Sequence, residues 1–141
     1  MAIKLRNQTN DELLNLSYAS IKVLKDLFRH WSKLESMSLR GDRIATDILL
    51  DLKRVTGIDI DYYNRNNRFS FDKRYELGVL SHYQYASIAY VLVLGYSQHD
   101  IAYMMGVDQS VIAKNLRRGL QKVSKCLVKG ISDGEIEKKR G

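Results

Sequence analysis

Apolar residues recur at three- and four-residue steps along most of this chain, which is the period of helices that bury one face. In the first half, one such stripe is made of Ile21, Leu24, Leu27 or Phe28, Trp31 and Leu34. Ahead of it, Thr9 as N-cap and Glu12 three residues later form a capping box. The pattern predicts one helix from about Asp11 to about Leu34, and the complete absence of proline favours such long helices.

A second helix is predicted to begin near Asp42, after a turn at residues 38–41. Gly57 supplies its end, and its apolar face is made of Ile44 or Ala45, Ile48, Leu52 and Val55. Residues 57–72 have the weakest pattern, and their asparagines favour a linker or loop, with a short strand or an ordered loop as the alternative. Residues 1–56 are therefore expected to form an N-terminal helical hairpin or bundle.

In the second half the pattern becomes sharper, and N-cap signals follow one another. Ser81 and Gln84 form a capping box that opens a helix running to Gly95. Ser97 and Asp100 form a similar box, with aspartate in the third helical position, that opens a short helix. These signals predict two successive helices joined by a glycine-containing connection.

The short helix is expected to end at Gly106, and Asp108 to cap a long last helix that Gly130 closes. One face of this last helix is apolar and is made of Ile112, Leu116, Leu120, Val123 and Leu127. Another face is basic and is made of Lys114, Arg118, Lys122, Lys125 and Lys129. The predicted fold is all-α, with a C-terminal domain at 73–130 that ends in a long basic helix and a flexible tail at 131–141.

The net charge of +7 is unevenly distributed along the chain. The first 70 residues carry 12 basic and 9 acidic side chains, whereas residues 109–129 carry basic side chains and no acidic one. A concentrated basic surface on a small protein suggests a polyanionic partner. The longest apolar run has seven residues, against about 20 for a membrane span, and the start of the chain lacks the apolar core of a secretory signal. We therefore expect a cytoplasmic protein that does not span a membrane.

An enzymatic function is not expected. The three histidines, His30, His82 and His99, are far apart in the sequence and share no metal-ligand spacing with Cys126. The chain has neither a glycine-rich phosphate loop nor a nucleophile motif. We therefore predict no catalytic residue, no metal and no cofactor, and interpret Cys126 as a packing residue.

The dimensions of the last two helices fit a helix-turn-helix. Ala102 is small where the two helices must approach, and Gly106 permits the left-handed backbone that turns the chain. The first turns of the last helix would then offer glutamine and basic side chains to base edges, and the helix N-termini would face phosphates. The predicted DNA-contacting residues are Ser97, Gln98, His99, Gln109, Ser110, Ala113, Lys114, Arg117, Arg118 and Lys122.

At residues 80–120 the sequence resembles region four of bacterial sigma factors. The resemblance is carried by Leu80-Ser81, by Gln84 and by the segment LGYSQHDIAYMMGVDQSVIAKNLRRGL at 94–120. It implies a module that reads duplex promoter DNA in the major groove and that contacts RNA polymerase. The chain departs from the family at Asp108, where serine is usual, and at Gly119, where alanine is usual. A glycine inside a helix costs about 0.5–1 kcal/mol, so Gly119 is expected to mark a close helix contact or a kink.

The first 70 residues show nothing like the sigma module that melts the −10 element. A helical N-terminal half followed by a sigma-four-like helix-turn-helix is similar in layout to small phage and prophage regulators of the RinA and ArpU type, which are late-gene activators. The predicted function is a sequence-specific duplex-DNA-binding transcriptional regulator, a phage or prophage activator in a bacterial host cell. The alternatives are a small terminase-like DNA-packaging subunit, a sigma-like RNA polymerase accessory factor, and a helix-turn-helix that docks a protein.

The N-terminal helices are expected to mediate self-association, most simply as a dimer, or to contact the polymerase. Dimers of helix-turn-helix proteins gain affinity by spanning two half-sites about one helical turn apart. The large apolar residues available for this are Leu24, Leu27, Phe28 and Trp31, which two short helices are not expected to bury fully.

Overall fold

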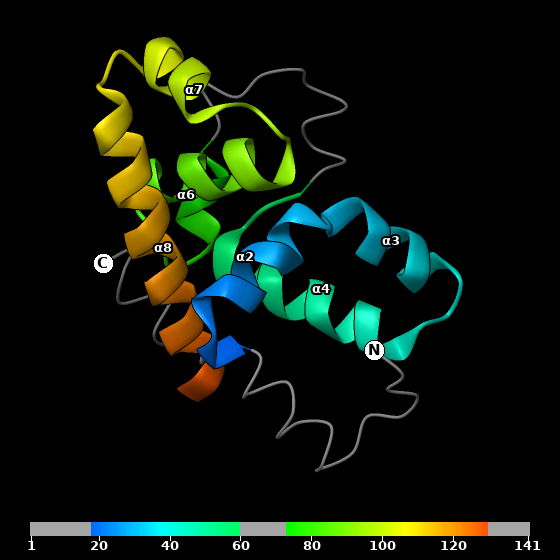
Figure 1. Ribbon diagram of the computed structural model, residues 1–141. Coiled ribbons are helices and arrows are strands. Elements are labelled where there is room, and N and C mark those ends of the chain that lie inside the picture. Colours follow the sequence, from blue (N-terminus) through cyan, green and yellow to red (C-terminus); the bar gives the residue numbers. More distant parts are fainter. Residues whose placement is uncertain (1–17, 60–72, 130–141) are drawn as a thin grey trace.

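A computed structural model of the chain describes residues 18–59 and 73–129, and every regular element in these ranges is helical (Figure 1). The all-α fold class is therefore confirmed. The elements are α2 (Ile21–Arg29), α3 (Trp31–Leu39), α4 (Arg43–Thr56), the 3-10 helix η1 (Arg74–Leu77), α6 (His82–Ala86), the π-helix η2 (Ser87–Val93), α7 (Gln98–Met105) and α8 (Gln109–Lys129). None of these helices has both the length and the apolar character needed to cross a bilayer.

The prediction of one helix from Asp11 to Leu34 is wrong within the described residues, because the chain is interrupted at Ser20 and again at His30. Ser20 has an extended backbone, and its side chain accepts a hydrogen bond from the Val23 N–H at 3.2 Å. His30 leaves helical geometry, and its Nδ1 lies 2.7 Å from the carbonyl oxygen of Asp26. Both side chains compete with helical backbone bonding, so the apolar stripe continues while the helix does not. The predicted capping box at Thr9 lies outside the described residues.

The second predicted helix is confirmed as α4. The Asp42 carboxylate accepts the Ala45 N–H at 3.0 Å, and Gly57 ends the helix with a left-handed backbone at φ +82°. The start of the expected linker, however, belongs to the core, since Ile58 is 1% exposed. Its remainder, at 60–72, lies outside the described residues.

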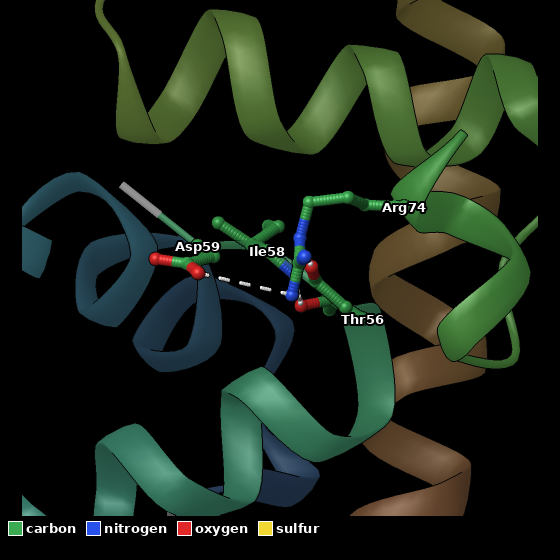
Figure 2. Close-up of polar contacts among 5 residues, drawn as sticks. Thr56, Ile58, Asp59 and Arg74 are labelled. Carbon is green, nitrogen blue, oxygen red and sulfur yellow. Dashed lines mark hydrogen bonds and ion pairs between the residues drawn. The ribbon is translucent and has the colours of Figure 1, made fainter. Parts of the chain in front are cut away.

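The end of α4 contacts the start of the second half of the chain at Gly57, Arg74 and Gly78. We call these three residues the α4–η1 junction. The Arg74 Nε donates to the Gly57 carbonyl at 2.7 Å, and its guanidinium reaches back to the Asp59 carboxylate at 3.9 Å (Figure 2). At Gly78 a Cβ would lie 2.1 Å from the Val55 carbonyl oxygen, so only glycine lets the two backbones approach this closely.

The helix predicted from Ser81 to Gly95 is present, and its capping box is confirmed in both directions between Ser81 and Gln84. Its second part is nevertheless a π-helix, η2, which the apolar spacing did not predict. The six consecutive residues 85–90 are all buried, because this helix packs against α2, α7 and α8 at the centre of the molecule. A helix covered on several sides has no polar face from which its hydrogen-bonding period could be predicted.

A single apolar core extends through both halves of the chain. It includes Leu24, Phe28 and Trp31 from the N-terminal helices together with Ile88 and Leu120 from the C-terminal ones. The expectation that the large residues of α2 and α3 would remain for a partner is therefore wrong for three of them. Leu24 and Phe28 are 0% exposed and Trp31 is 1% exposed, whereas Leu27 is half-buried.

Candidate nucleic-acid interface

Helices α7 and α8 are joined by a tight turn whose geometry follows from local residues. The Ser97 side chain caps α7 by accepting the Asp100 N–H at 3.0 Å. Gly106 ends α7 in the left-handed region at φ +69°, and the Val107 N–H donates to the Ala102 carbonyl at 3.0 Å. The chain therefore reverses direction within a few residues and begins α8 at Gln109 (Figure 1).

The predicted apolar face of α8 is buried along its length. Its five residues, Ile112, Leu116, Leu120, Val123 and Leu127, are at most 8% exposed. At Gly119 the helix comes so close to its neighbour that an added Cβ would lie 3.0 Å from Ile88 Cδ1 and 3.2 Å from Gln84 Cβ. Gly119 therefore marks a close contact of α8 with α6 and η2, which is one of the two expectations for this glycine.

The opposite face of α8 is open. Of the ten residues predicted to contact DNA, nine are exposed and Gln98 is half-buried; the exposed ones are Ser97, His99, Gln109, Ser110, Ala113, Lys114, Arg117, Arg118 and Lys122. For most of the α8 residues this exposure follows from helical periodicity, because they lie on the side away from Ile112 and Leu116. Gln109 is in register with Ile112 and Leu116, and its exposure goes with its position as the first residue of α8.

The ten residues form two groups. Seven lie along α8, from Gln109 to Lys122, a stretch of about 20 Å. The other three, Ser97, Gln98 and His99, lie at the start of α7, at the opposite end of that helix from the turn, about 12 Å away. The first backbone N–H groups at the start of a helix lack intrahelical partners and favour anions.

Sequence reasoning did not single out Gln121, which is exposed on the same side of α8 as Lys125, a residue already placed on the basic face. The sequence already indicated both positions. Gln121 is four residues after Arg117 and Lys125 is eleven residues after Lys114, so both continue the same helical face. Every charged side chain on α8 is basic, and Asp100 and Asp108, on and just after α7, are both exposed. The site thus presents an acid-free basic stripe beside a small acidic end.

The described residues contain no group of three or more His, Cys, Asp and Glu side chains placed to hold a metal ion. His82 lies against the ring of Tyr75 with centroids 5.0 Å apart, whereas His30, between α2 and α3, and His99, on α7, are both exposed. Comparisons with protein-family models, with curated proteins and with solved structures find no significant match to this chain.

Proposed function

We propose that this protein is a sequence-specific duplex-DNA-binding transcriptional regulator whose α8 enters the major groove. The observation that supports this most directly is the division of α8 into a buried apolar face and an exposed, acid-free basic face. A rod of this length with glutamine, lysine and arginine on its open side fits the width of the major groove and offers donors for guanine and adenine edges.

In this proposal the residues have different roles along the helix. Gln109, Ser110, Ala113, Lys114 and Arg117, on the first turns, meet base edges. Arg118 and Lys122 lie one or more turns further along and contact the sugar–phosphate backbone where the helix leaves the groove. The start of α7, with Ser97, Gln98 and His99, binds a phosphate across the groove through its N–H groups.

We further propose that the regulator is a phage or prophage late-gene activator that acts in the cytoplasm of a bacterial host, with contact to RNA polymerase. This part depends on the resemblance of residues 80–120 to sigma region four. A homodimer would bring two α8 helices to two half-sites. We assign the contact between the two subunits of this homodimer to an apolar hollow of about 360 Å³ between α2, α3 and α4. Val23, Leu27 and Ile48 are among the residues that line it.

The test separates base reading from backbone binding within one helix. Gln109→Ala and Arg117→Ala should each cost about 1–3 kcal/mol on a selected binding site and little on scrambled duplex. Lys122→Ala should weaken both duplexes alike and lower the slope of log affinity against log salt by about one. The measurement is a titration of each variant on both duplexes at several salt concentrations.

Equal losses for Gln109→Ala and Lys122→Ala on both duplexes would contradict base reading by α8. No salt-sensitive duplex binding by the unaltered protein would contradict the function as a whole. A ring-shaped assembly found by mass measurement, together with binding to a packaging site, would instead favour the terminase-like alternative.

A further inference from the structure

Helix α2 begins against the last third of α8, although the two are about 100 residues apart in the sequence. The Ser124 hydroxyl donates to the Tyr18 carbonyl at 2.6 Å and fixes this approach. A shallow hollow between the two helices is lined by Ala19 and Ile21 on one side and by Gln121, Lys125 and Val128 on the other. Figure 1 shows the start of α2, in blue, crossing the final turns of α8, in orange.

Two lysines of α2 lie at this crossing. Lys22 follows Ile21 and is exposed, and Lys25 is one helical turn after Ile21 and half-buried. A half-buried lysine packs its stem against the neighbouring surface and keeps its ammonium in solvent. Among the described residues, neither lysine forms an ion pair. The one acidic residue of α2, Asp26, lies one turn after Lys22 and also lines the apolar hollow. Against it, α2 carries three basic residues, Lys22, Lys25 and Arg29.

The two helices therefore bring together cations from opposite ends of the chain. Lys125 lines the hollow from α8, and Lys22 and Lys25 lie on α2 close to Ile21, which lines it from the other side; we call these three lysines the α2–α8 basic surface. Along α8, Lys125 lies about 24 Å beyond Gln109, which is about twice the width of the major groove. Such residues are too far from the first turns of α8 to read the same base edges.

We propose that the α2–α8 basic surface binds the phosphate backbone of duplex DNA that flanks the base pairs read by the first turns of α8. This inference rests on the proposed function and adds the N-terminal half of the chain to the DNA interface. Lysine ammonium groups bind phosphates as point charges and release counterions, so their contribution does not depend on sequence and falls with salt. The surface extends the site along the backbone and leaves sequence recognition to the first turns of α8.

The experiment compares two double variants that remove the same charge. Lys22→Ala with Lys25→Ala removes the α2 part of the surface. Arg40→Ala with Arg43→Ala is the control, because both arginines are exposed at the connection between α3 and α4, on the side of the molecule away from α8 (Figure 1). Affinity is measured on a selected site and on scrambled duplex over a range of salt concentrations, and thermal unfolding of each variant verifies that it is folded.

The α2 variant should lose affinity equally on both duplexes, and its salt slope should fall by about two, or about 0.9 for each phosphate contact. The control variant should keep the slope of the unaltered protein. Equal slopes for the two variants would overturn the inference while leaving the proposed function intact. A loss confined to the selected site would also overturn it, whereas absence of duplex binding by the unaltered protein would remove the proposed function itself.

Discussion

Two pairs of consecutive helices, α2–α3 and α7–α8, are both joined by very short connections, yet they are specified in different ways. Between α7 and α8, Gly106 adopts a left-handed backbone that turns the chain locally. Between α2 and α3 there is no glycine, and the chain departs from helical geometry at His30. The α3 helix packs mainly on α4, and Phe28 and Trp31 stack with ring centroids 6.2 Å apart. The α7–α8 turn is thus specified by one glycine, whereas the α2–α3 boundary depends on the His30 side chain, which contacts the Asp26 carbonyl, together with the packing of α3 on α4.

The exposed faces of the two pairs differ as well. On α8 the exposed face is an uninterrupted basic stripe, whereas α2 and α3 mix lysine and arginine with Asp26 and Glu35. Packing in the core does not restrict which residues stand on the surface. An exposed helix face that carries only positive charges along six turns is therefore more informative about a partner than the buried face is. This contrast is the reason why the proposed DNA contact is placed on α8 and not on α2 or α3.

The largest expected effect tests whether the apolar stripe of α2 belongs to the monomer core. Phe28→Ala should lower the free energy of unfolding by about 3–5 kcal/mol, because the ring is fully buried. Val23→Ala, on the same helix but 38% exposed, should change it by less than about 0.5 kcal/mol. Denaturant unfolding measures both, and dissociation of an oligomer by Phe28→Ala without loss of monomer stability would contradict the burial.

The next effect compares the α4–η1 junction with the α7–α8 turn. Gly78→Ala should lower the free energy of unfolding by about 3 kcal/mol, because its Cβ would meet a backbone carbonyl that cannot rotate away. Gly106→Ala should cost about 1–2 kcal/mol, since its Cβ meets nothing within 4 Å and only the left-handed backbone is penalised. Equal losses in the same denaturant measurement would mean that the junction adjusts, and that the two halves are less tightly joined than their backbones indicate.

The sequence predicted the features that depend on neighbouring residues. The start of a helix near Asp42, the Ser81–Gln84 box and the ends of helices at Gly57 and Gly106 are confirmed, because each is a local hydrogen bond or a local backbone requirement. The exposure of most of the predicted α8 residues follows from helical periodicity in the same way. These features define the order of the C-terminal helices and the open face of the last one.

Features that depend on distant contacts could not be predicted. The π-helix at 87–93 lies where α8 comes closest at Gly119, and no spacing within 87–93 encodes that approach. The burial of Leu24 and Phe28 requires a neighbour that lies more than 50 residues away in the sequence. Likewise, the position of Ile21 beside Lys125 follows only from the packing of α2 on α8. The boundary at His30 was missed for a different reason: it depends on a local contact of the His30 side chain with the Asp26 carbonyl, and neither proline nor glycine marks the position.

The smallest expected effect separates a structural cap from a DNA contact made by the same residue type. Ser81 and Ser97 are both exposed, and each caps a helix. The Ser81 hydroxyl accepts the Gln84 N–H at 3.3 Å, and the Ser97 hydroxyl accepts the Asp100 N–H at 3.0 Å. Ser81→Ala and Ser97→Ala should therefore each lower the free energy of unfolding by about 1 kcal/mol. Only Ser97 lies in the proposed interface, so only Ser97→Ala should also weaken duplex binding, and it should do so equally on selected and scrambled DNA. Thermal unfolding and duplex titration at fixed salt measure the two effects. If Ser81→Ala weakened binding as much as Ser97→Ala does, the start of α7 would have no contact of its own with the phosphate backbone.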